Sequence, residues 1–117
     1  MGSEGTLAFF QRIHLKLQPL PAHKTLGVCH FPSFYEAMDA TQHIVELNPS
    51  AVELVDRTMI DLARDIPMFA GTVDRFVRGE PQALLLVEFS GEEQADQLRS
   101  LSQLVELMES MGFHDAV

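Results

Sequence analysis

The clearest candidate for ligand chemistry is a glycine-rich segment at the N-terminal end, Gly2-Ser3-Glu4-Gly5-Thr6-Leu7. Glycine adopts backbone angles that are closed to other residues, so main-chain N–H groups in such a segment can approach a ligand closely. A segment of this composition is also common in an ordinary loop that leads into a strand. Taken alone, the six residues leave both interpretations open.

The other reactive residue types are not spaced as catalytic or metal-binding motifs. The five histidines form neither His-x-His nor His-Glu-x-x-His, so no local metal site is encoded. The sequence has no serine nucleophile elbow, Cys-x-x-Cys or phosphate loop, and no pair of carboxylates is spaced for acid/base catalysis. We therefore assign no catalytic and no metal-binding residue. Cys29, the single cysteine, lies in a strand-like segment and is predicted to be a buried, inert thiol.

Composition limits the class of protein. The chain has 117 residues, 46% of them apolar, and a net charge of −9, which describes one globular domain. An acidic surface repels phosphate backbones, so nucleic-acid binding is disfavoured. The longest apolar run, Ala83 to Val87, is far too short to cross a bilayer, and no secretory signal is visible. A single cysteine fits a reducing compartment, so we expect a cytoplasmic location.

The first element that must position the glycine-rich segment is a strand. Ile13, Leu15 and Leu17 alternate with polar residues, which predicts a strand from Leu7 to Leu17 with one solvated face. Pro19 and Pro21 then form a short, stiff linker, which is the expected domain boundary. A strand that is separated from its sheet must find a new partner or fray.

After the linker, strands and helices alternate. Ser33 with Glu36, and Ser90 with Glu93, have the spacing of capping boxes that open helices, and Gly112 is placed to end the last helix. Strands are expected at residues 24–31, 50–55 and 82–89, and a final strand is expected to begin within residues 113–117. Helices are expected at residues 34–47, 57–66, 68–78 and 91–111. This order predicts an α+β fold, a ferredoxin-like antiparallel sheet with helices packed on one face, plus the extra N-terminal strand.

Several segments together, in order, resemble the FAD-linked oxidases that act on 2-hydroxy acids, the family of D-lactate dehydrogenase, the glycolate oxidase flavin subunit and D-2-hydroxyglutarate dehydrogenase. The glycine-rich segment is similar to the Gly-Ser-Glu-Gly-Thr-Leu-Gly run that closes that family's flavin domain. Further similar segments are Leu15–Pro21 for the exit strand and linker, and Phe31–Phe34, Ala51–Arg57 and Leu84–Phe89 for the substrate domain. Ala8 and Gln11-Arg12 depart from the family pattern, which bears on flavin contact and not on the domain assignment.

The resemblance implies a division of the chain. Residues 1–21 would be the last strand of the FAD-binding domain and the linker, and residues 22–117 part of the substrate (cap) domain. It implies FAD as the cofactor of the parent enzyme, with a small 2-hydroxy acid as substrate, a separate electron acceptor, and a cytoplasmic location or a peripheral one at the inner membrane. The implied cofactor-binding residues are Gly2, Ser3, Glu4, Gly5 and Thr6.

The same resemblance implies that this chain is inactive by itself. The family's pyrophosphate-binding segment would lie upstream of these residues, and its His-Gly-His-x-Gly-Asp-Gly-Asn motif downstream. We therefore expect the chain alone to bind no FAD tightly and to turn over no substrate, because the redox chemistry belongs to the flavin and its positioning residues.

Glu53, Asp56 and Arg57 have two interpretations. In the parent enzyme they would lie near the flavin edge. In the structural interpretation, which we favour, Asp56 caps a helix, Arg57 is a surface charge and Glu53 lies on the polar side of a strand.

Alternatively, the chain is a self-standing ferredoxin-like domain with a binding or regulatory function, and this domain dimerises. In either case the strand at residues 7–17 has an open edge with Phe9, Ile13, Leu15 and Leu17 on it. We expect two copies to form a homodimer by strand pairing there.

Overall fold

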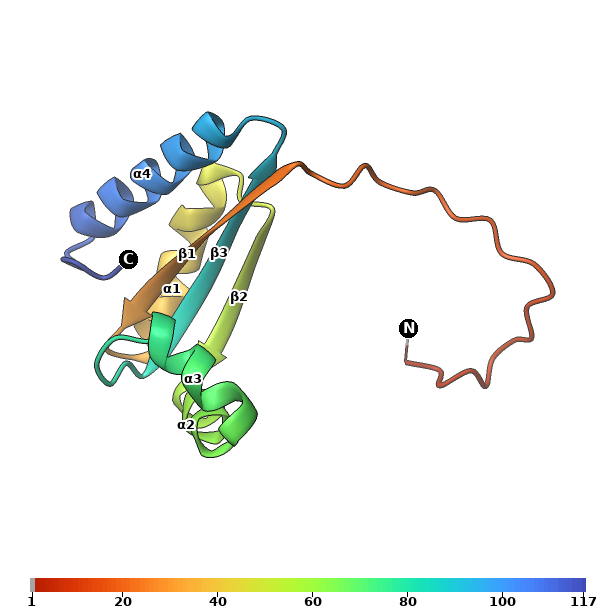
Figure 1. Ribbon diagram of the computed structural model, residues 1–117, viewed down its shortest axis with the longest axis horizontal. Coiled ribbons are helices and arrows are strands. Elements are labelled where there is room, and N and C mark those ends of the chain that lie inside the picture. Colours follow the sequence, from red (N-terminus) through yellow and green to blue (C-terminus); the bar gives the residue numbers. More distant parts are fainter. Residues whose placement is uncertain (1) are drawn as a thin grey trace.

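The folded part of the protein centres on a three-stranded antiparallel sheet, seen in a computed structural model that describes residues 2–117 (Figure 1). The central strand is β3 (Ala83–Gly91), with β1 (His23–Phe31) on one side and β2 (Ala51–Asp56) on the other. An apolar strand without alternation is typical of a position covered on both faces, and β3 has this position. The predicted α+β class with an antiparallel sheet is confirmed.

Two helices, α1 (Phe34–Ile44) and α4 (Gln94–Ser110), cover one face of the sheet. Side chains alternate along a strand, so the buried residues on this face are two apart: Gly27, Cys29 and Phe31 of β1, and Ala83, Leu85, Val87 and Phe89 of β3. Gly27 allows α4 to come close to β1, since a Cβ at this position would lie 2.5 Å from Cδ2 of Leu104. The core of this layer contains Cys29, Phe31, Ala37, Ala40, Ile44, Ala83, Leu85, Val87, Phe89, Leu104 and Met108.

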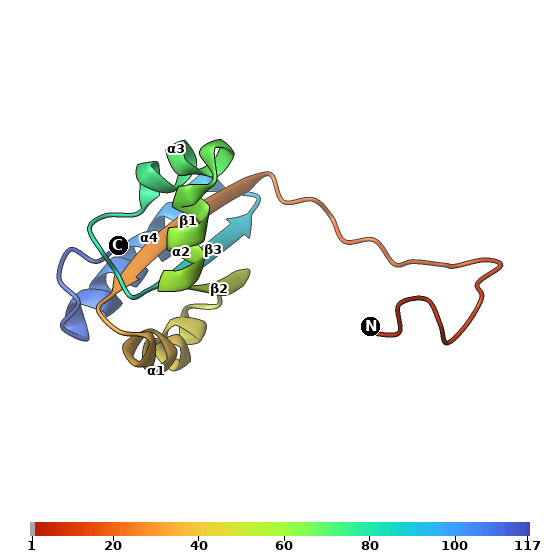
Figure 2. The ribbon, with the colours of Figure 1, turned by 90° about the horizontal axis from the view of Figure 1, so that it is seen from below.

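The other face of the sheet carries α2 (Arg57–Asp65) and α3 (Pro67–Phe76) over one end, as Figure 2 shows. Pro67 ends α2 and stands at the first turn of α3, so the two short helices form a compact pair. This placement differs from the expectation of helices on one face only. Leu84 points to this second face, and its burial to 1% exposure requires a cover, which Ile60, Val73 and Val77 provide.

Helix capping agrees with the sequence at three of four positions. The Ser33 hydroxyl accepts the Glu36 N–H, Asp56 accepts the Met59 N–H at 2.9 Å, and Gly112 has the positive φ of 89° that ends α4. The capping box at Ser90 is wrong, because β3 pairs with β1 as far as Gly91 and Ser90 is still part of the strand. α4 therefore begins later, and a short 3₁₀ helix, η1 (Val45–Leu47), follows α1.

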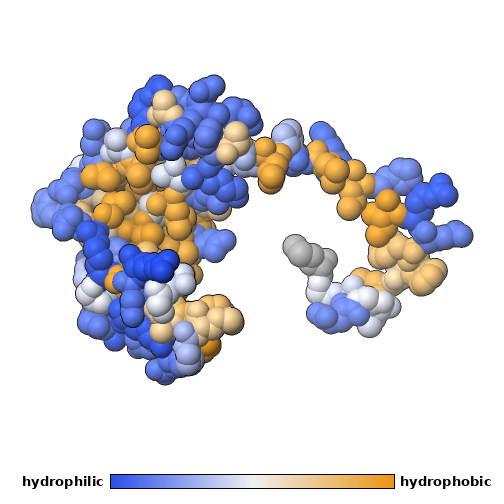
Figure 3. Space-filling model, viewed as in Figure 1, coloured by the Kyte–Doolittle hydropathy of each residue, from blue (hydrophilic) through white to orange (hydrophobic). Residues whose placement is uncertain are grey.

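The N-terminal segment differs from its prediction. Residues 7–20 form no strand and run away from the folded part (Figure 1). Phe9 is 94% exposed, and Figure 3 shows apolar side chains along this segment in open solvent. A strand needs hydrogen-bond partners on a neighbouring strand, and none of the described residues supplies them. The alternating pattern alone does not create a strand.

The C-terminal residues do not form the predicted strand either. A ferredoxin-like sheet has four strands, and three are formed within residues 2–117. After Gly112 the chain turns back toward β1, where the Ala116 carbonyl accepts the His30 N–H at 2.8 Å. The three strands have the order β1-β3-β2, so β1 is an edge strand of the sheet. The full ferredoxin-like arrangement remains a prediction.

Candidate functional site

The predicted flavin-contacting residues form a small exposed turn. The Thr6 N–H and the Thr6 hydroxyl both donate to the Ser3 carbonyl, at 2.9 and 2.5 Å. The φ angles of Gly2, Glu4 and Gly5 are 85°, 49° and 76°, which the glycines adopt without steric cost. A turn of this kind directs backbone N–H groups outward, where they can bind an anionic or electron-rich group. The structure does not bring this turn together with any residue of the folded part.

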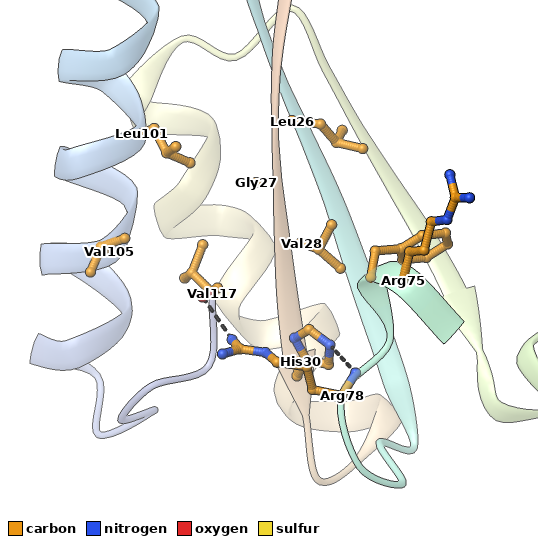
Figure 4. Close-up of a pocket in the computed structure, with 10 residues that line it drawn as sticks. Leu26, Gly27, Val28, His30, Arg75, Arg78, Leu101, Val105 and Val117 are labelled. Carbon is orange, nitrogen blue, oxygen red and sulfur yellow. Dashed lines mark hydrogen bonds between the residues drawn. The ribbon is translucent and has the colours of Figure 1, made fainter. Parts of the chain in front are cut away.

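The second candidate feature is a groove along the open edge of β1, with a volume of about 330 Å³. Figure 4 shows its two walls, Leu101 and Val105 from α4 on one side and Arg75, next to Val28, on the other. Val117, at the C-terminal end, lies between them. The groove is lined by Leu26, Gly27, Val28, His30, Arg75, Phe76, Arg78, Leu101, Val105 and Val117.

The His30 side chain forms hydrogen bonds on both sides of its ring in this groove. Its Nε2 accepts the Arg78 backbone N–H at 3.0 Å, and its Nδ1 lies 3.0 Å from the Ala116 carbonyl oxygen. A carbonyl oxygen can only accept, so Nδ1 carries the hydrogen and the imidazole is the neutral Nδ1–H tautomer. His30 thereby joins three segments that are far apart in the sequence, namely β1, the loop before β3 and the C-terminal residues.

Arg78 fixes the C-terminal residues from the same side. Its guanidinium donates to the carbonyl oxygens of Asp115 and Val117, at 3.1 and 2.7 Å, and its side chain is half exposed. Figure 4 shows the bond to Val117 and the bond between the Arg78 N–H and His30. Sequence reasoning missed both residues. The only available signal was that His30 follows the buried Cys29 in a strand and must face the opposite side.

Glu53, Asp56 and Arg57 have the structural roles that we favoured. Asp56 is the N-cap of α2, and Glu53 is exposed on β2. Arg57 forms ion pairs with Asp61 at 2.8 Å and Glu80 at 2.5 Å, which tie α2 to the loop before β3. The hydrogen bond that the Arg57 guanidinium donates to Asp61 is the main cause that raises its pKa, and the hydrogen bond to Glu80 adds to it.

Cys29 and the histidines show no reactive cluster. Burial raises the pKa of the Cys29 thiol to about 12, so the prediction of a buried thiol is confirmed. Among residues 2–117, no three His, Cys, Asp or Glu side chains lie close enough to hold a metal ion. None of the described helices is long and apolar enough to span a bilayer.

The fold and these two sites describe an α+β domain that displays an exposed glycine turn and a groove along the edge of its sheet. Comparison with known proteins gives its family. Residues 20–117 match the family described as FAD linked oxidases, C-terminal domain. The chain belongs to this family, as the sequence predicted.

The chain is similar to several curated dehydrogenases. It is 32% identical over 97 residues to D-2-hydroxyglutarate dehydrogenase of Escherichia coli (strain K12), covering 80% of this chain and 10% of that protein. It is 39% identical over 62 residues to the mitochondrial D-lactate dehydrogenase [cytochrome] of Arabidopsis thaliana, covering 51% of this chain and 11% of that protein. The chain thus spans about a tenth of the length of these relatives. No solved structure matches.

Proposed function

We propose that this chain is part of the substrate domain of an FAD-dependent oxidoreductase that oxidises a small 2-hydroxy acid of the D-lactate, glycolate or D-2-hydroxyglutarate type. The observation that supports this most strongly is the family match over residues 20–117. The relatives are named as dehydrogenases of D-2-hydroxyglutarate and D-lactate, and their similarity extends over most of the chain. In this proposal residues 1–21 end the FAD-binding domain and residues 22–117 begin the substrate domain.

We assign flavin contact to the turn formed by Gly2, Ser3, Glu4, Gly5 and Thr6. The positive φ at both glycines supports this, because a backbone of this shape, with no side chain at either glycine, allows a ligand to approach closely. When bound, FAD supplies the hydride acceptor and passes electrons to a separate acceptor. The turn would contribute backbone donors to it, and the folded part of this chain would position the substrate.

The parent protein tests the role of the turn through a matched pair of substitutions. Gly5 and Gly79 both have a positive φ, 76° and 65°, and a Cβ at either position meets no atom within 4 Å. Gly5→Ala and Gly79→Ala therefore carry the same backbone strain. We expect only Gly5→Ala to lower the fraction of purified parent protein that carries FAD, measured by visible absorbance. Equal FAD content in the two variants would contradict the assignment.

The isolated chain should be inactive. We expect the purified 117-residue protein to be colourless and to reduce no dye with D-lactate, glycolate or D-2-hydroxyglutarate. The whole parent protein should be yellow and should reduce the dye with one of these acids. A parent protein that carries flavin but oxidises none of these acids would contradict the proposed substrate class. A colourless parent protein would contradict the proposal that it is an FAD-dependent enzyme.

We also propose that the exposed segment at residues 7–17 pairs between copies of the isolated chain. Its apolar side chains, such as Phe9 and Leu17, are exposed, and burying them against a second copy would release ordered water from them. Light scattering should show a dimer that becomes a monomer when residues 1–20 are removed. A monomer at high concentration before the removal would contradict this pairing.

We place the parent enzyme in the cytoplasm or at the surface of the inner membrane, which cell fractionation tests.

A further inference from the structure

An apolar cavity lies between the α2–α3 pair and the second face of the sheet. Its volume is about 140 Å³. Val55 of β2 and Leu84 of β3 form its base, and α2 and α3 cover it, at the end of the sheet that Figure 2 shows. All of its lining residues lie within residues 55–86, so one continuous part of the chain builds the whole cavity.

A small side chain in the cover leaves room for this cavity. Protein interiors are packed as densely as organic crystals, and voids larger than a water molecule are few. Ala63 of α2 lines the cavity with a single methyl group, whereas Ile60, on the same helix, is buried in the neighbouring apolar cluster. A larger side chain at residue 63 would occupy the space that the alanine leaves.

The lining of the cavity selects a neutral apolar occupant. It consists of valine, leucine, isoleucine, methionine, alanine and phenylalanine side chains, with no polar one among them. A buried water needs about two to four polar partners, so water does not fill a cavity of this kind. A charged group would lose its hydration there without gaining a partner.

The size of the cavity and its entrance limit the occupant further. An apolar cavity of about 150 Å³ stays dry and binds benzene. Val73 and Leu84 are buried, whereas Met59 is 57% exposed and Leu86 is half-buried, so the cavity opens toward these two side chains. The flexible Met59 side chain can move aside as a ligand enters. We propose that this cavity is a binding site for a small neutral apolar molecule, an aromatic ring or a branched alkyl group of about six carbon atoms.

An apolar side chain from the exposed segment of a second copy is the weaker occupant. Phe9 and Leu17 of that segment are exposed, and no strand or helix holds their backbone. Fixing this backbone in the cavity costs conformational entropy, whereas a rigid small molecule has no such backbone to order. The cavity therefore favours a free small molecule, and this site does not rest on the proposed function.

Toluene is the probe for this site, because it is a neutral ring of suitable size. Benzoate and benzylamine carry a negative and a positive charge on the same ring and are the matched ligand controls. NMR contacts between the ligand and methyl groups of the full chain locate the bound molecule, and the Tm is measured with each ligand. Ala63→Leu places a larger side chain in the cavity. Ala70→Leu makes the same change at a half-buried position of α3 outside the cavity.

We expect saturable contacts between toluene and the methyl groups of Val73 and Leu84, and a Tm that rises with toluene, as for a ligand that binds only the folded state. Ala63→Leu should weaken this binding by about tenfold or more, and Ala70→Leu should leave it unchanged. Equal binding in the two variants would overturn the site. Contacts to exposed side chains alone would overturn it too, and this result needs no variant to fold.

The remaining outcomes concern the occupant. Benzoate or benzylamine that binds in the cavity as well as toluene would overturn the ligand class. Toluene binding that appears only after residues 1–20 are removed would overturn the assignment to a free molecule, because the exposed segment would then fill the cavity. None of these measurements depends on flavin or on a 2-hydroxy acid.

Discussion

The close contact between β1 and α4 gives a quantitative prediction at Gly27. In the Gly27→Ala variant the new Cβ would lie 2.5 Å from Cδ2 of Leu104 and 3.1 Å from Cδ1 of Leu101. Leu104 is fully buried, so its side chain has no free space into which it can turn. The helix must move away from the strand or Leu104 must leave its preferred rotamer. Overpacking of this kind costs about 1–3 kcal/mol of the free energy of unfolding.

A double-mutant cycle separates this contact from other effects of the substitution. Leu104→Ala alone removes a buried side chain and should cost about 3–5 kcal/mol. In the double variant the new Cβ at residue 27 enters the space that Leu104 leaves, so the 2.5 Å clash is removed and only the 3.1 Å contact with Leu101 remains. The two changes together should therefore cost less than the sum of the single changes, by about 1–3 kcal/mol.

Gly71→Ala is the matched control, because a Cβ at Gly71 in α3 meets no atom within 4 Å. This variant should be more stable by about 0.5–1 kcal/mol, since alanine favours the interior of a helix over glycine. Urea unfolding followed by circular dichroism measures all four variants. The reasoning is refuted if Gly27→Ala is as stable as the original chain, or if the double variant costs the full sum.

Three further predictions concern single groups. Cys29 should react with a thiol reagent at pH 8 on the order of 10³-fold more slowly in the folded protein than in urea, since its pKa rises from 9.0 to about 12, and equal rates would contradict its burial. Ser33→Ala should lower the free energy of unfolding by about 1 kcal/mol in urea titrations, because the N-cap of α1 loses its acceptor, whereas an unchanged midpoint would exclude this role. The pKa of Glu109 is lowered by the hydrogen bond from His114 and then by the Asp115 N–H, so its stabilising effect is full above its ordinary value of 4.5 and is lost as the pH falls through the lowered pKa. In a carboxyl titration followed by NMR, the midpoint of Glu109 should be lower in the original chain than in the His114→Ala variant. Identical midpoints would show that the hydrogen bond from His114 does not lower this pKa.

Local patterns in the sequence determined most elements of the folded part. The apolar run of β3 indicated a covered central strand, and the helix starts at Ser33 and Asp56 followed from side chains that accept the N–H group three residues further on. The end of α4 followed from Gly112, whose positive φ suits glycine. These signals depend on residues close in sequence, which is why one sequence is enough to find them.

Features that depend on distant partners were decided by the tertiary structure. The pattern at residues 7–17 predicts a strand, but no described strand pairs with it and it stays extended in solvent. β3 extends past Ser90 because Ser90 pairs with Lys24 and Gly91 with His23 of β1, and this shifts the start of α4. The apolar faces of α2 and α3 were visible in the sequence, whereas the choice between the two faces of the sheet was not.

The groove at β1 is the clearest example of this limit. His30 and Arg78 are 48 residues apart, and their hydrogen bond exists only because β1 and the loop before β3 meet in space. The sequence alone determined the family and the local elements, because family segments and periodic patterns are continuous along the chain. The sheet edge, the positions of α2 and α3 and the binding of the C-terminal residues depend on contacts between distant segments, and only folding brings those segments together.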